Sequence, residues 1–245
     1  MIRQPSRRSA LLFLTGLATP SLASAQGSPP LPQVTTPVVP PVTSPVPPAV
    51  LPRPPAAPPN AIDKTKSYYL FFDQNIDVAS MRTLRRELAN LVEAGVSEIT
   101  LVIDSAGGQV EPMLITYSFI QALPARINTH AQGFVQSAAT LLFLAGQERS
   151  ADRDARFLFH PSQSVVTGLL GEQQFRERLT AFDAITDAMT QIFRDRTKLS
   201  PSEIDRFGRE TVIYTAEQAR AAGVVQTVGD LRIPGGGKAK ILFMD

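Results

Sequence analysis

The sequence predicts an α/β fold in which strands and helices alternate around a largely parallel sheet. Three observations lead to this prediction. Short apolar or aromatic runs have the length of strands, longer stretches carry apolar residues at helical spacing, and the two kinds of segment alternate after residue 60. With 245 residues, of which 43% are apolar and 19% charged, the chain is long enough for one well-buried core, so we expect one globular domain.

The expected elements follow one another closely in the first half of that domain. Residues 67–72 are aromatic and apolar, as in a strand, and the apolar residues that follow recur at helical spacing up to Gly95. Residues 98–103 form a nearly continuous apolar run, which is typical of a buried strand. The same patterns then predict a helix at 110–123, a strand at 127–131, a helix of small residues at 137–145 and a strand at 156–160.

A single long helix is expected between Gly171 and Lys198. Its apolar stripe recurs at about 3.5 residues and consists of Phe175, Leu179, Phe182, Ile185, Met189, Ile192 and Phe193. Such a helix either packs on its own domain or supplies an oligomer contact, and the periodicity leaves both interpretations open.

The end of the domain alternates again. We expect a strand at 212–214, a capped helix at 215–222 that stops at Gly223, and a strand at 224–228. Gly235-Gly236-Gly237 then marks a flexible break, so residues 236–245 are expected to form a short C-terminal tail.

Two segments precede the domain. Arg7-Arg8, an apolar run and Ala23-Ser24-Ala25 occur in the order of a signal peptide, so we expect residues 1–25 to be removed on export. The arginine pair also allows the twin-arginine route. The apolar run is far shorter than the roughly 20 residues of a membrane-spanning helix, so the mature chain is expected to carry no integral membrane segment. Residues 26–65 are predicted to be a disordered, proline-rich linker that favours polyproline II, either as a tether or as a tail without a ligand.

Composition excludes several classes of protein and site. The chain has no cysteine, which excludes disulfides, thiolate zinc sites and a lipid anchor on cysteine. Without Arg3, Arg7 and Arg8, the 24 basic residues become 21 against 22 acidic ones, which gives no electrostatic reason to expect nucleic acid as a partner. The two histidines lie at no metal-ligand spacing and no nucleotide-binding glycine loop is present, so neither a metal nor another cofactor is expected.

Three segments carry residues suited to chemistry, and each also has a structural interpretation. Gly107 and Gly108 follow an apolar strand, where they form either a ligand-binding turn or only a tight turn. Ser137 stands at the start of a helix, as a nucleophile or as a helix cap. His160 ends a strand, as a catalytic base or as a structural histidine.

In this order, the three segments resemble the proteolytic subunit of Clp protease, within the crotonase-like superfamily. The resemblance covers residues 66–235. It implies that Ser137 is the nucleophile, that His160 is its base, and that the N–H groups of Gly107 and Ala138 form the oxyanion hole. It also implies that an extended substrate binds along Gly108, Gln109 and Val110.

The same resemblance implies a fold of repeated strand-strand-helix units. The helix from Gly171 would be the handle that joins two rings, so a homo-oligomeric ring is expected. Residues 66–235 would then be a Clp-protease-like serine hydrolase domain.

The chain departs from the family pattern at several positions. Asp104, Ala106, Gln136 and Ala138 stand where the family prefers Asn, Pro, Ala and Met. The third triad position falls on Thr211, which cannot carry the charge that stabilises an imidazolium. Two alternatives stay open for the third member. Either the carboxylate of Glu210 or Asp205 takes this role from a displaced position, or Ser137 and His160 act as a dyad in which the Thr211 hydroxyl orients the ring.

The expected function is an exported serine-type endopeptidase that cleaves short or unfolded peptides without ATP, and weakly because of Thr211. A non-catalytic assembly protein that keeps the fold and the rings is the alternative from another class. A crotonase-like enzyme acting on an acyl thioester is a further alternative, which a Ser137–His160 pair and export away from coenzyme A disfavour.

Overall fold

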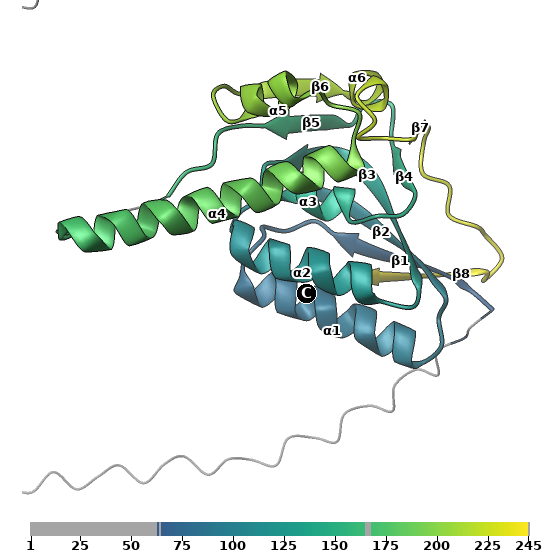
Figure 1. Cartoon of the computed structure of the whole chain (residues 1–245). Helices are drawn as coiled ribbons and strands as arrows, with labels where there is room; N and C mark the ends of the chain where they lie inside the picture. The colour runs from purple at the N-terminus through teal and green to yellow at the C-terminus, as the bar shows by residue number, and fades with distance from the viewer. Residues whose placement is uncertain (1–62, 64, 165–167, 245) are drawn as a thin grey trace, which may run out of the picture. The chain divides into compact units, whose positions relative to one another are not determined.

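A sheet of eight strands forms the centre of the part of the chain that this computed structural model describes, residues 63, 65–164 and 168–244 (Figure 1). The expected signal peptide and the linker up to residue 62 lie outside the described residues. The strands are β1 (Ser67–Phe72), β2 (Glu98–Ser105), β3 (Arg126–Gln136), β4 (Arg149–Ala151), β5 (Arg156–Phe159), β6 (Val212–Thr215), β7 (Thr227–Val228) and β8 (Ala239–Phe243).

The strand order is β6-β5-β3-β2-β1-β8, with β4 beside β3 and β7 beside β4. All of these pairs are parallel except β5 with β6, which is antiparallel. The helices of the described part are α1 (Val78–Glu93), α2 (Val110–Ala122), α3 (Ala138–Leu144), α4 (Glu172–Arg196), α5 (Pro201–Phe207) and α6 (Ala216–Ala221). The mixed α/β fold expected from the sequence is therefore confirmed.

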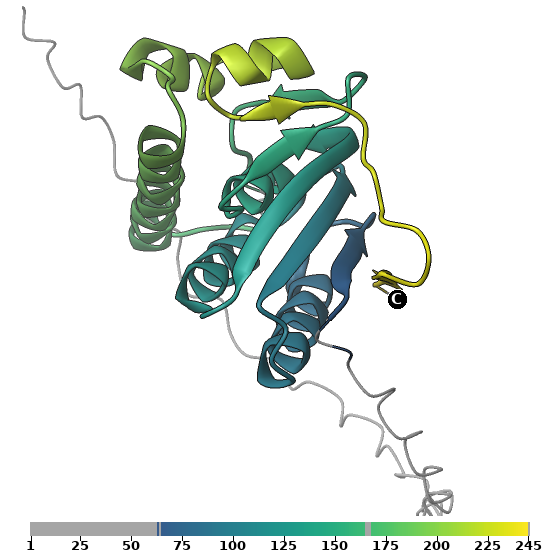
Figure 2. The same ribbon diagram turned by 90° about the vertical axis from the view of Figure 1, so that its right-hand side faces the viewer.

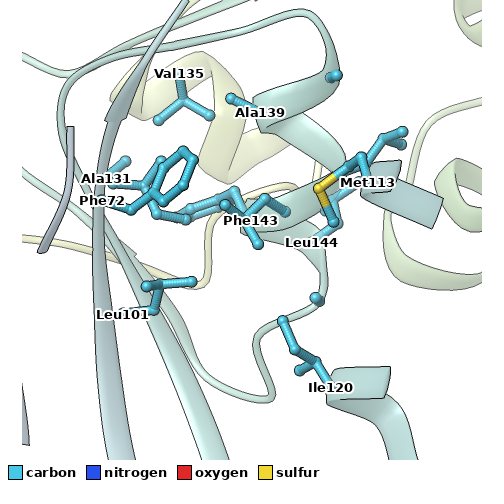
Figure 3. Packing of buried hydrophobic residues seen from close by; sticks show 14 of the residues in the cluster. Phe72, Leu101, Met113, Ile120, Ala131, Val135, Ala139, Phe143 and Leu144 are labelled. Atoms are coloured by element: carbon cyan, nitrogen blue, oxygen red, sulfur yellow. The ribbon is translucent and has the colours of Figure 1, made fainter. Parts of the chain in front are cut away.

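One face of the sheet packs against helices to form the core (Figure 2). Along β1 the side chains alternate, so that Tyr68, Leu70 and Phe72 are buried while their neighbours are partly exposed. Figure 3 shows Phe72 beside Leu101 of β2 and close to side chains from α3. The core is therefore built by the strand alternation and helix stripes that the sequence displays.

Helix α3 is buried all round, and this fixes the residue before it. All seven of its residues are buried, including the small side chains of Ala138 and Ala139. A short helix without a polar face is stable only when surrounded by other elements. The turn from β3 into α3, which holds Ser137, therefore leads directly into a fully buried helix.

Helix α4 has two different halves. Its C-terminal half packs against α2, α3 and α5 and buries Ile192 and Phe193. Its N-terminal half projects away from the sheet in Figure 1, and residues 172–180 are all exposed. Phe175 and Leu179 leave 58% and 51% of their surfaces open.

Several elements differ from the sequence expectation. Strand β3 continues to Gln136 rather than ending near 131, because its last part pairs with β5. The strand expected at 224–228 is reduced to Thr227–Val228, since Val224 and Val225 bond back to the end of α6. Strand β8 lies beyond the expected domain boundary at 235 and pairs in parallel with β1, where only a tail was expected. The sequence pattern also missed β4 and α5.

The buried Arg149 joins the ends of three helices. Its guanidinium donates to Val224 O at 2.8 Å and to Gly223 O after α6, to Arg196 O in α4, and to Gly146 O after α3. Burial, together with the nearby Arg196, lowers the pKa of Arg149 to about 10. The C-terminal carbonyls of a helix carry partial negative charge, which a cation at this position compensates.

Candidate active site

The carboxyl ends of three neighbouring parallel strands bring the candidate segments together. Gly107 follows β2, Ser137 follows β3 and His160 follows β5, and these strands are adjacent in the sheet. This edge is where open α/β sheets form binding sites. A cavity of about 890 Å³ lies here, and all three residues line it.

Ser137 occupies a strained position in the turn from β3 to α3. With φ at +52° and ψ at −127°, it is the one residue other than glycine with a positive φ in the described part of the chain. Such a conformation costs about 1–3 kcal/mol and persists only where its surroundings hold it. The Ser137 N–H donates to Leu158 O at 2.8 Å, and the Thr140 hydroxyl donates to Ser137 O at 2.6 Å, so the main chain is held on both sides.

The Ser137 hydroxyl does not cap the helix. Ser137 is the N-cap residue of α3, but its side chain accepts no capping hydrogen bond. The interpretation of Ser137 as a cap alone therefore lacks its defining contact. The side chain borders the cavity instead.

Gly107 lies directly against the serine turn. A Cβ atom at Gly107 would stand 2.5 Å from Gln136 O, 2.9 Å from Ser137 Cβ and 3.0 Å from the Ala138 nitrogen. The φ of Gly107, +87°, also favours glycine. The glycine turn after β2 thus reaches the start of α3 at a distance that only a residue without a side chain allows.

Of the two N–H groups expected to form the oxyanion hole, one is already engaged in a hydrogen bond and the other is not. The N–H of Ala138, the first residue of α3, has no hydrogen-bond partner among the described residues. The Gly107 N–H donates to Ser105 Oγ at 3.2 Å, which is at the long end of the normal range. The Ser105 hydroxyl donates in turn to Gln74 O at 2.7 Å.

His160 lines the cavity at the end of β5, and one of its ring nitrogens is engaged in a hydrogen bond. Its Nδ1 lies 2.7 Å from Pro161 O. Because a carbonyl oxygen only accepts, Nδ1 carries the proton and Nε2 has a free lone pair. This is the tautomer in which a histidine accepts a proton from a serine. Within the described residues, no hydrogen bond joins His160 to the Ser137 hydroxyl.

Thr211 directly precedes β6, which pairs with β5, the strand that His160 follows. These strands pair antiparallel with Phe159 opposite Val212, so one further step along each strand reaches His160 and Thr211. Thr211 is exposed. Its hydroxyl makes no hydrogen bond to the described part of the chain.

The two carboxylates near Thr211 are engaged elsewhere. Glu210 pairs with Arg206, and Asp205 lies 3.7 Å from Arg209, both in exposed ion pairs on and after α5. Neither carboxylate accepts a hydrogen bond from His160. In this structure the hydrogen-bond partner of the His160 ring is the carbonyl of Pro161.

The other histidine lies in a separate buried cluster. His130 Nδ1 lies 2.9 Å from Ser150 Oγ, and Nε2 lies 3.0 Å from Asp152 Oδ1. The carboxylate only accepts, so Nε2 carries the proton and the Ser150 hydroxyl donates to Nδ1. Burial lowers the pKa of His130. Asp152 also accepts from the Leu231 N–H at 2.8 Å, so the cluster fastens the chain after β7, and none of its residues lines the cavity.

The expected substrate residues Gly108, Gln109 and Val110 all line the cavity. The Gln109 N–H, however, donates to Ile76 O at 2.8 Å, and the Ile76 N–H donates to Gly107 O at 2.8 Å. Backbone pairing with a substrate at this edge must therefore use groups other than the Gln109 N–H.

Sequence reasoning missed the apolar wall of the cavity. Part of the stripe of α4, which the sequence offered as an interface, turns toward the cavity and is joined there by residues of β5 and α5. This wall consists of Phe159, Phe182, Ile185, Met189, Phe193, Ile204 and Phe207. The apolar stripe of α4 indicated in the sequence that this helix has an apolar face. The period of such a stripe, however, does not determine whether that face contacts the core, a cavity or another subunit.

None of the helices in the described ranges is both long and apolar enough to span a membrane. In a comparison with protein families, the family described as Clp protease matches residues 62–232. That range contains every candidate residue of the cavity and ends before β8.

Three similar proteins illustrate the match. The ATP-dependent Clp protease proteolytic subunit 3 of Streptomyces coelicolor is 30% identical over 142 residues, which is 56% of this chain and 64% of that protein, less than two thirds of its length. Subunit 1 of Streptomyces avermitilis is 28% identical over 154 residues, covering 62% of this chain and 70% of the relative. Subunit 2 of Corynebacterium jeikeium is 27% identical over 169 residues, which cover 66% of this chain and 79% of that relative.

Proposed function

This chain belongs to the Clp protease family, and from that premise we propose that it is an exported serine endopeptidase with Ser137 as nucleophile and His160 as base. The observation that carries the proposal is the strained Ser137, whose φ is positive and whose hydroxyl makes no capping bond, in one cavity with His160 and the Gly107 turn. Strain of this kind clusters at functional sites because the fold must hold it there.

The proposed reaction begins with proton transfer. His160 Nε2 takes the hydroxyl proton of Ser137 while Oγ forms a bond to the carbonyl carbon of the peptide, whose oxygen becomes an anion. The imidazolium then gives this proton to the leaving nitrogen, and the carbon–nitrogen bond breaks to leave an acyl-enzyme. Water attacks the acyl group with the same base, which releases the acid and restores Ser137.

Oxyanion binding falls to the turn beside Ser137. The free Ala138 N–H is one donor, and the Gly107 N–H is the other once it exchanges Ser105 Oγ for the substrate oxygen. A hydrogen bond of 3.2 Å is weak enough for this exchange. One such donor is worth about 10²–10³ in rate.

The imidazolium in this proposal lacks a carboxylate partner. Pro161 O fixes the tautomer but carries only a partial charge, and Thr211, which directly precedes β6, carries none. Loss of the orienting aspartate in a serine protease costs about 10⁴ in turnover, so we propose a slow, dyad-type enzyme. Glu210 remains the alternative third member, if its ion pair with Arg206 opens.

The substrate is proposed to be a short or unfolded peptide, extended along Gly108 to Val110. The apolar wall from α4 and α5 supports a preference for a bulky apolar side chain next to the scissile bond. The signal-peptide order of the N-terminus supports export to the periplasm or beyond, where no nucleotide is supplied to an unfoldase, so the activity is proposed to be independent of ATP.

A homo-oligomer, most simply a ring, is part of the proposal. The exposed apolar side chains in the projecting half of α4 support it, because a monomer would leave them in water. Rings are also typical of the family to which the chain belongs.

A fluorophosphonate probe that reacts with activated serines tests the chemistry. We expect the assembled wild type to be labelled on Ser137 and to hydrolyse peptides slowly, and we expect Ser137→Ala and His160→Ala to lose both. Ser150→Ala is the matched control, since Ser150 also contacts a histidine but lies outside the cavity, and it should keep both. His130→Gln should also keep activity at temperatures where it stays folded.

The same experiment separates the second candidate, a non-catalytic assembly protein. The absence of a carboxylate on His160 within the described residues favours that candidate. An assembled wild type that is neither labelled nor active would establish it, whereas hydrolysis that survives in Ser137→Ala would remove Ser137 as the nucleophile.

A further inference from the structure

The C-terminal strand reaches the candidate active site through a short chain of hydrogen bonds. Strand β8 pairs in parallel with β1 over five register positions, from Ser67 with Ala239 to Phe71 with Phe243 (Figure 1). Met244, which follows β8, is buried in the core and its N–H donates to Phe71 O at 3.3 Å. The end of β8 is therefore held in place by its backbone hydrogen bonds to β1 and by the buried side chain of Met244.

Gln74 connects this strand to the loop that follows β1. Its side-chain amide donates to Met244 O at 3.1 Å, across 170 positions of sequence. Its own carbonyl accepts the hydroxyl of Ser105 at 2.7 Å, and Ser105 Oγ accepts the N–H of Gly107. One residue thus contacts the C-terminal strand on one side and the glycine turn on the other.

The loop after β1 holds the glycine turn by its main chain as well. Ile76 N–H donates to Gly107 O, and Gln109 N–H donates to Ile76 O, both at 2.8 Å. Gly108 lies so close that a Cβ on it would stand 2.1 Å from Ile76 O. Any shift of the loop would therefore move the turn that faces Ser137.

We propose that β8 is an intramolecular clamp that positions the Gly107 turn of the active site, with Gln74 as the positioning residue that transmits its effect. The inference rests on the proposed function for its consequence in catalysis. Strand β8 lies outside residues 62–232, the range that matches the family.

The physical reason is the small tolerance of an oxyanion donor. A donor aids the reaction only when it lies within hydrogen-bond distance of the developing charge, and a displacement of about 1 Å costs on the order of 10²-fold. Without β8, the edge of β1 and the Gln74 amide lose their partners, and the loop samples more conformations. The apolar wall of the cavity comes from other elements, so substrate affinity should change little.

Amide hydrogen exchange tests the clamp independently of activity. The wild type is compared with a deletion of residues 235–245 and with Gln74→Met, which removes the amide donor at similar size. We expect exchange at Ile76 and Gln109 to accelerate about three- to tenfold in Gln74→Met and further in the deletion. Gln121→Met is the matched control, since the Gln121 amide also donates to a carbonyl, Ala145 O at 2.8 Å, and it should leave both amides unchanged.

Catalysis provides the second measurement. We expect Gln74→Met to lower kcat and the rate of fluorophosphonate labelling by about tenfold with KM nearly unchanged, while the thermal midpoint equals that of Gln121→Met. A purely structural role would move the midpoint and leave kcat per folded molecule as it is. If the deletion variant fails to fold, Gln74→Met decides the question.

The outcomes distinguish the two proposals. If the wild type is labelled, and Gln74→Met shows unchanged or faster labelling with unchanged exchange, the clamp is refuted while the proposed function stands. If the wild type is not labelled, the proposed function fails, and exchange at Ile76 and Gln109 still decides whether β8 positions the turn.

Discussion

Replacing Gly107 by alanine is the sharpest test of how the two turns of the site meet. The new Cβ would stand 2.5 Å from a main-chain oxygen and 2.9 Å from the Cβ of Ser137, and neither atom belongs to a flexible side-chain end. The residue also keeps a φ of +87°, which alanine adopts poorly. Both effects strain the folded state without a comparable effect on the unfolded chain.

The magnitude follows from these two contributions. A non-glycine residue in the left-handed region costs about 1–2 kcal/mol, and an added methyl group in a packed site costs about 1–3 kcal/mol. Together they predict a loss of about 2–5 kcal/mol, which is a large part of the roughly 5–15 kcal/mol that stabilises a folded protein. For a chain of this size the unfolding midpoint should fall by about 4–20 °C.

Calorimetry with two glycine controls separates the contributions. Gly236→Ala tests the backbone effect alone, since Gly236 has a φ of +68° and nothing within 4 Å of a new Cβ. Gly229→Ala tests neither effect, because its surroundings are open and its φ is ordinary. We expect the midpoints to fall in the order Gly229→Ala, Gly236→Ala, Gly107→Ala, with the last variant the least stable.

Labelling of Ser137 below the unfolding temperature completes the assay. The same Cβ displaces the Gly107 N–H from its place beside Ala138, so labelling should slow by about 10²–10³, the value of one oxyanion donor. A Gly107→Ala protein as stable as Gly229→Ala would refute the close approach. A destabilised variant with normal labelling would instead refute Gly107 as an oxyanion donor.

Three further predictions concern stability and assembly. Burial lowers the pKa of His130 below the 6.5 of a free histidine, so the unfolded chain binds the proton more readily and stability should fall as the pH drops below about 6.5. In urea titrations below about pH 6.5, the free energy of unfolding of the wild type should fall by up to about 1.4 kcal/mol per pH unit. In His130→Gln, this contribution to the pH dependence of the unfolding free energy should be absent. Arg149→Met should destabilise the fold by about 3 kcal/mol, because it leaves buried carbonyls at three helix ends without a donor. Equal thermal unfolding midpoints for wild type and Arg149→Met would contradict this role of Arg149. The double variant Phe175→Ser with Leu179→Ser should stay folded and dissociate into monomers in sedimentation, because it removes exposed apolar surface of α4; an unchanged oligomer would place the interface elsewhere.

Much of the fold follows from the sequence because strand and helix periodicity are local properties. The strand at 67–72 was predicted with its observed bounds, and the long helix, observed as Glu172–Arg196, was predicted within two residues at each end. The candidate residues were found from a glycine pair after a strand (Gly107), a serine at a helix start (Ser137) and a histidine at a strand end (His160), in the order of a known family. In a parallel sheet, residues that follow neighbouring strands meet at one edge.

What the sequence left open depends on contacts between distant residues. The conformation of Ser137 and the engagement of the Gly107 N–H arise from how β2, β3 and α3 pack, and no local pattern encodes them. The same is true of His160, whose ring partner is Pro161 O, while Glu210 is held by an arginine one turn away. Composition supplies the residue types, but packing decides which of them meet.

The C-terminal strand shows the limit most plainly. By itself the sequence determined that an apolar segment follows a run of glycines, which is equally compatible with a loose tail. Only the tertiary structure decided that this segment becomes β8, because its ladder is completed by β1, about 170 residues earlier in the chain. A strand exists only where a partner satisfies its backbone groups, and a partner so distant in sequence is supplied by the folded chain as a whole.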